Sequence, residues 1–104
     1  MRRLQDYRGR FIRLTNERLA HIQERVEMRG MDATVALTLA APERVLRSTS
    51  DPEVELYYRF CEGTLVGDKY LCVAVKLLTN DAFVLTAYLT DAIKRGVVVW
   101  LGDK

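Results

Sequence analysis

The sequence predicts an α+β fold, in which N-terminal helices pack on one face of an antiparallel meander sheet of four strands or slightly more. Helical spacing of apolar residues is confined to residues 16–41, whereas residues 44–90 alternate as strands do. Short turns separate these strands, so neighbours should run antiparallel. A chain of 104 residues, 49% of them hydrophobic, is sufficient for one domain with a core of its own. We therefore expect a single domain over residues 1–104.

The helical part follows one short predicted strand over residues 9–15, with Phe11 and Arg13 on one side and Ile12 and Leu14 on the other. The first helix is predicted over about residues 16–28, after a cap at Thr15 or Asn16 and before Gly30. A second helix over residues 33–41 is bounded by Asp32 and Pro42. Its residues are apolar or small nearly all round, so we expect it to be well buried.

The remaining chain is predicted to be β-structure. Strands are expected over residues 44–50, 54–62, 69–78 and 82–90. A helical turn over residues 91–96 and a last extended piece over residues 97–101 would complete the chain.

One stretch, "FVLTAYLT" at residues 83–90, has a distinctly polar side. Strict alternation puts Phe83, Leu85, Ala87 and Leu89 towards the core, and Val84, Thr86, Tyr88 and Thr90 on the other face. Tyr70 and Lys76 of the preceding strand should join the second group. The pattern predicts an open sheet face of aromatic, hydroxyl and cationic groups, which would suit RNA.

Charge is distributed unevenly along the chain. Residues 1–30 contain eight arginines and four acidic residues, and residues 31–104 contain eight basic and ten acidic residues. Arginine forms bidentate contacts with phosphate, so this asymmetry favours nucleic acid as a partner, although a solvated surface explains it as well.

Several classes of site and location are disfavoured. No apolar segment approaches the roughly 20 residues that span a bilayer, and no apolar stretch follows the charged N-terminus, so we expect a cytoplasmic protein with no membrane contact. Cys61 and Cys72 are expected to be reduced. With His21 they are too few for a structural zinc site, and no phosphate-cradling glycine loop is present, so neither a metal nor a cofactor is predicted.

Five residues are candidates for chemistry. His21 is the only histidine and can transfer protons near neutral pH. Arg47 and Lys76 can bind phosphate, and Thr86 and Tyr88 can donate hydrogen bonds to it. Each has an ordinary alternative: a solvated histidine, surface ion pairs and a half-exposed sheet face.

The chain also resembles a known family. The segments that carry this resemblance are "LTNERLAHIQERVEM", "PERVLRSTSDP", "LYYRF", "GDKYLCVAVK" and "FVLTAYLTDAIKRG". Together they are similar to a phage- and bacterial-type nuclease family of the barnase–EndoU–colicin–RelE-like (BECR) group, over about residues 10–100. The resemblance implies helices on a four-stranded antiparallel sheet, metal-independent RNA cleavage and, for many small members, a restraining companion protein. It assigns the site to His21, Arg47 with Ser48, Lys76, Thr86 and Tyr88.

The first predicted function is therefore that of a small endoribonuclease, of toxin or processing type, in which a ribose 2′-hydroxyl attacks the adjacent phosphorus. His21 would be the acid/base, and Arg47 and Lys76 would stabilise the transition state, with Thr86 and Tyr88 orienting the phosphate. Two alternatives are a non-catalytic RNA-binding module and a structural domain whose sheet face or edge pairs with another protein. The sequence leaves the oligomeric state open, including a homodimer.

Overall fold

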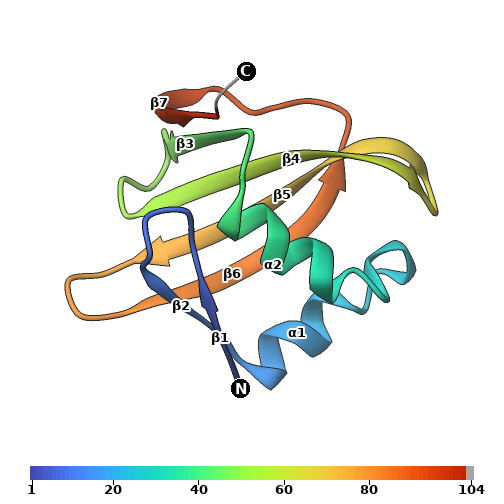
Figure 1. Cartoon of the computed structure of the whole chain (residues 1–104), viewed down its shortest axis with the longest axis horizontal. Coiled ribbons are helices and arrows are strands. Elements are labelled where there is room, and N and C mark those ends of the chain that lie inside the picture. Colours follow the sequence, from blue (N-terminus) through green and yellow to red (C-terminus); the bar gives the residue numbers. More distant parts are fainter. Residues whose placement is uncertain (103–104) are drawn as a thin grey trace.

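The computed structural model describes residues 1–102, which form seven strands, two α-helices and one short 3-10 helix (Figure 1). In chain order these elements are β1 (Arg2–Gln5), β2 (Phe11–Leu14), α1 (Asn16–Ile22), the 3-10 helix η1 (Val26–Met28), α2 (Asp32–Ala40), β3 (Arg44–Ser48), β4 (Val54–Thr64), β5 (Gly67–Leu77), β6 (Ala82–Thr90) and β7 (Gly96–Leu101).

All seven strands belong to one mixed sheet in the order β1-β2-β6-β5-β4-β3-β7. The predicted four-stranded antiparallel sheet with leading helices is therefore wrong. A β-hairpin precedes the helices, and its second strand joins β6 in parallel at Arg13 and Phe83. At the other end β7 adds to β3, so the predicted meander β3–β6 is only the middle of the sheet. β1 was missed because two of its four residues are arginine, which gives no strand pattern.

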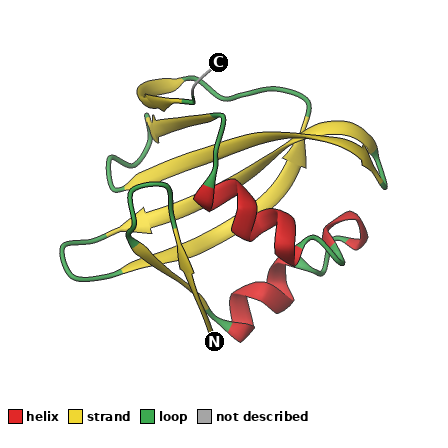
Figure 2. Ribbon diagram, viewed as in Figure 1, coloured by secondary structure: helices red, strands yellow, loops and turns green. Residues whose placement is uncertain are grey.

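The first helix is shorter than predicted, and the second has the predicted length but is less buried. Thr15 caps α1, because its Oγ1 accepts a hydrogen bond from the Arg18 N–H at 3.1 Å, but α1 ends at Ile22. The chain then passes through η1 and through Gly30, whose φ of +77° favours glycine. α2 buries only one side, and Leu37 is 46% exposed on the other. Figure 2 shows both helices over the same side of the sheet.

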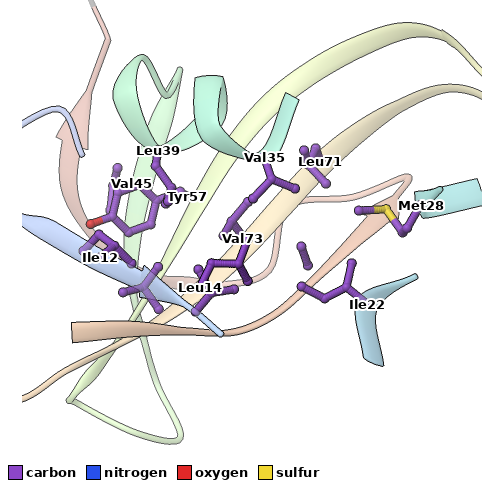
Figure 3. Packing of buried hydrophobic residues seen from close by; sticks show 13 residues of the cluster. Ile12, Leu14, Ile22, Met28, Val35, Leu39, Val45, Tyr57, Leu71 and Val73 are labelled. Atoms are coloured by element: carbon purple, nitrogen blue, oxygen red, sulfur yellow. The ribbon is translucent and has the colours of Figure 1, made fainter. Parts of the chain in front are cut away.

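This helix-covered face of the sheet holds the main core (Figure 3). Its buried members are Ile12, Leu14, Ile22, Met28, Val35, Leu39, Val45, Tyr57, Leu71, Val73, Val75, Val84 and Ala87. They come from β2–β6 and from every helix, so the N-terminal hairpin and the helices share one core with the meander.

The opposite face, which we call the second face, is not open along its whole length as predicted. In its middle lies a smaller buried cluster of Leu46, Val54, Leu56, Tyr58, Cys72 and Ala74. The segment between β6 and β7 packs on this cluster through Ile93, and the Lys94 N–H donates to the Tyr58 hydroxyl at 3.1 Å. The expected helical turn over residues 91–96 is absent, since this segment is irregular as far as β7.

A β-bulge in β6 changes which side chains face the core. Thr86 lies opposite Ala74, but Val84 lies opposite the next residue, Val75, which leaves Leu85 as an extra residue. Val84 is therefore fully buried in the main core, and Phe83 lies opposite Lys76 on the second face. The prediction for Ala87, Leu89, Thr86, Tyr88 and Thr90 agrees with the observed faces, whereas that for Phe83, Val84 and Leu85 is wrong.

Candidate nucleic-acid interface

The five predicted site residues do not gather in one place. His21 lies on α1, on the helix-covered side, with 52% of its side chain exposed and its Nδ1 3.6 Å from the Glu24 Oε1. Arg47 lies exposed near the end of β3, on the same side of that strand as buried Val45. Both residues are separated by the sheet from the three candidates on the second face.

Lys76, Thr86 and Tyr88 do share the second face, but Lys76 already has partners. Its Nζ lies 2.7 Å from the Asp51 Oδ2 and 3.2 Å from the Glu53 Oε1. The hydrogen bond to Asp51 raises the pKa of Lys76 and lowers that of Asp51, so both groups are charged at neutral pH. A phosphate at Lys76 would have to compete with two carboxylates.

Tyr88 is half-buried and packs against the second-face cluster that contains Cys72. Burial raises the pKa of the Tyr88 phenol, as it does for Cys72 on the neighbouring strand, and the Lys94 Nζ lies 5.6 Å from the Tyr88 ring centroid. Both groups are therefore protonated at neutral pH, as they would be without the shift. Tyr88 is therefore suited to donating a hydrogen bond and poorly suited to acting as a base.

The two cysteines are free, and their side chains lie on opposite faces of the sheet. Cys61 packs against the main core and Cys72 lies in the second-face cluster. Within residues 1–102 no group of three His, Cys, Asp or Glu side chains is arranged to hold a metal ion.

A different set of residues combines exposure, charge and aromatic surface. On β2, Ile12 and Leu14 are buried in the core, so Phe11 and Arg13 point to the second face. Phe11 is 59% exposed, and the guanidinium carbon of Arg3, from the adjacent strand β1, lies 4.9 Å from its ring centroid. This distance is typical of a cation–π contact.

The same pairing is repeated one strand further into the sheet. The guanidinium carbon of Arg13 lies 5.4 Å from the ring centroid of Phe83, its register partner on β6. Two hydrogen bonds from Arg13 to Asp81, at 2.9 and 2.6 Å, hold the guanidinium over that ring. We call Arg3, Phe11, Arg13 and Phe83 the arginine–phenylalanine platform.

A buried polar network fixes the hairpin that presents the platform. The Asp6 side chain accepts from the backbone N–H groups of Arg8 and Arg10, from the Arg10 Nε at 2.9 Å and from the Tyr57 hydroxyl at 2.7 Å. Arg10 also donates to Glu55 at 3.3 Å. Because Tyr57 and Glu55 belong to β4, this network ties the turn of the hairpin to the centre of the sheet.

A cleft lined by other residues lies away from this platform. It has a volume of about 740 Å³ between the hairpin turn, the end of α2 and the end of β7, and Tyr7 and Trp100 line it with ring centroids 4.7 Å apart. Arg59 and Glu43 also line it, but Arg59 donates to the Ala41 carbonyl and Glu43 accepts from the Phe60 N–H. None of the five predicted site residues contributes to this cleft.

Comparison with known proteins gives no relative, since no family model, no curated protein and no solved structure matches the chain. None of the helices within residues 1–102 has the length and apolar character needed to span a membrane.

The sequence did contain a signal for the platform. The alternation of Phe11 and Arg13 with two apolar residues is visible in "FIRL", and the surplus of arginine in residues 1–30 is a property of the same region. Two members of the platform could not be predicted from the sequence. Arg3 lies on β1, which was not predicted, and the position of Phe83 on the second face depends on the bulge in β6.

Proposed function

We propose that the protein binds single-stranded RNA through the arginine–phenylalanine platform. The observation that carries this proposal is the 59% exposed Phe11 on the second face, with the Arg3 guanidinium carbon 4.9 Å from its ring centroid. Unpaired bases stack on exposed aromatic rings, and arginine contributes both stacking and phosphate contact. Duplex RNA keeps its bases inside the helix and should bind less tightly.

The platform should bind by stacking more than by charge. Arg13 is paired with Asp81, and Lys76 is paired with Asp51 and Glu53, whereas Arg3 has no ion pair among the described residues. We therefore expect the logarithm of affinity to fall with the logarithm of salt concentration with a slope near that of one or two phosphate contacts, about 1.

The proposal is tested by fluorescence anisotropy with a labelled single-stranded RNA of mixed sequence, about 12 nucleotides long, in EDTA. Phe11→Ala should weaken binding by about 5- to 150-fold, the range expected for loss of one stacked base. Leu37→Ala removes an exposed apolar side chain from α2 on the other side and should bind like the parent. Equal affinities of the parent and Phe11→Ala would refute the proposal.

A second pair of variants separates the platform from the site predicted by the family resemblance. Arg3→Ala should weaken RNA binding, whereas Arg47→Ala should not, because Arg47 lies on β3 towards the other end of the sheet. The reverse result would favour the site built around Arg47.

Cleavage is the further step that the nuclease resemblance predicts, and the same RNA tests it. Metal-independent cleavage would give 2′,3′-cyclic phosphate ends in EDTA and would disappear in His21→Ala. Binding at the platform requires no cleavage. If the protein binds the RNA and the RNA stays intact, the protein is a binding module without nuclease activity. A small companion protein belongs to this nuclease prediction, and the cytoplasmic location expected from the sequence stays a prediction.

A further inference from the structure

The two edge strands of the sheet differ in how they are protected. β1 is four residues long and contains Arg2 and Arg3, whereas β7 is six residues long and has the uncharged sequence "GVVVWL". Figure 1 shows the two strands at opposite ends of the sheet. Charged side chains on an edge strand discourage pairing with another chain, and β7 has none.

Within residues 1–102, the backbone edge of β7 that faces away from β3 pairs with no other strand, and several apolar side chains of β7 are exposed. Val97, Val98 and Leu101 are 58%, 51% and 54% exposed. The inner side pairs with β3, where a Cβ at Gly96 would lie 2.5 Å from the Arg47 carbonyl oxygen, so only glycine permits this close approach. A bulge at Val99 interrupts the strand, which leaves Gly96–Val98 as its regular edge.

We propose that β7 pairs antiparallel with β7 of a second copy of this chain, centred on Val97. Val97 of one copy would then lie opposite Val97 of the other, and Gly96 opposite Val98. No charged side chain would be buried between the two strands. The pairing is two-fold symmetric, so the assembly closes as a dimer.

The basic residues beside β7 favour antiparallel pairing of β7 with β7 over parallel pairing of these strands and over pairing of β7 with β1. Lys94 and Arg95 directly precede the strand, and antiparallel pairing places the two basic pairs at opposite ends of the shared edge. Parallel pairing would set four cations side by side. Pairing of β7 with β1 would bring them towards Arg2 and Arg3, where like charges oppose association. The dimer leaves the arginine–phenylalanine platform free, because β1 and β2 lie at the far edge.

The oligomeric state of the full chain tests the inference. Sedimentation equilibrium of the parent across a concentration series should show a monomer–dimer equilibrium. Val97→Lys should weaken dimerisation by about tenfold or more, because two ammonium groups would face one another. Leu65→Lys adds the same charge at the β4–β5 turn, where Leu65 is 71% exposed, and should dimerise like the parent.

A cross-linking variant decides the matter if Val97→Lys fails to fold. Val97→Cys places two thiols directly opposite one another in the proposed register, so mild oxidation should give a disulfide-linked dimer, and Leu65→Cys should not. A parent that stays monomeric at its highest soluble concentration would overturn the inference, and β7 would then be free for a strand of another protein. A dimer that neither β7 variant affects would overturn it equally.

Discussion

Tyr57 is a single residue on which the position of the N-terminal hairpin depends. Its ring lies in the main core, while its hydroxyl donates to Asp6 at 2.7 Å and accepts from the Arg10 Nη2 at 3.1 Å. The Asp6 side chain has no exposed surface, so every partner that it loses leaves a buried carboxylate less well satisfied.

We expect Tyr57→Phe to lower the free energy of unfolding by about 1–3 kcal/mol, because it removes the hydroxyl and keeps the ring. Urea denaturation followed by circular dichroism measures this difference. Tyr70→Phe, which removes a phenol hydroxyl from the half-buried second face, is the matched control and should change stability less. Equal losses in the two variants would show that the Asp6 network contributes nothing particular.

At the scale of the element, β6 shows where an alternating pattern stops being informative. Phe83, Leu85, Ala87 and Leu89 form a perfect period-two apolar row in the sequence, and yet only the last two face the main core. The extra residue Leu85 shifts the phase, and a bulge depends on pairing with β5 that a single strand cannot reveal.

The bulge is tested by two nearly isosteric changes on neighbouring sites. Val84→Thr would put a hydroxyl into the main core and should lower the free energy of unfolding by about 1–3 kcal/mol, since Val84 is fully buried. Thr86→Val, on the half-buried second face, should change stability by much less. Thermal melts of the two proteins distinguish the cases, because uninterrupted alternation would make Val84→Thr the harmless one.

At the scale of the whole molecule, the four strands of the meander were predicted well, but the full order of the sheet was not. β3–β6 were expected within a few residues of their observed bounds, because local side-chain patterns define them. The order of the sheet depends on pairings between distant segments, such as β2 with β6, for which the sequence pattern has no local trace. The predicted site shared this weakness, since its residues were assigned one by one and were expected to form one site.

Buried phenols on both faces make the whole molecule sensitive to alkali. Burial raises the pKa of Tyr58 to about 12 and also raises those of Tyr57 and Tyr88, whereas a phenol in the unfolded chain titrates near 10. Above pH ~10 the unfolded chain therefore loses these protons before the folded protein does. The contribution of these phenols to the free energy of unfolding should be constant below pH ~10. Above that pH it should fall, by up to ~1.4 kcal/mol per pH unit for each phenol.

Urea titrations at a series of alkaline pH values should show this fall. Tyr58→Phe should make the decline between pH ~10 and 12 shallower than in the parent, apart from any constant offset caused by losing the Lys94 hydrogen bond. An identical slope in the two proteins would mean that the Tyr58 phenol ionises as readily when folded as when unfolded.

The parallel pairing of β2 with β6 also fixes an order of events during synthesis. The N-terminal hairpin is made first, but its place in the sheet does not exist until β6 has been made, after all of the intervening strands. Until then Ile12 and Leu14 have no sheet on which to pack, and contacts between such distant segments form slowly. The proposed RNA platform takes Phe83 from that same late region, as well as Asp81, the partner that holds Arg13. A nascent chain that already carries Arg3 and Phe11 would therefore gain RNA affinity only near the end of its translation.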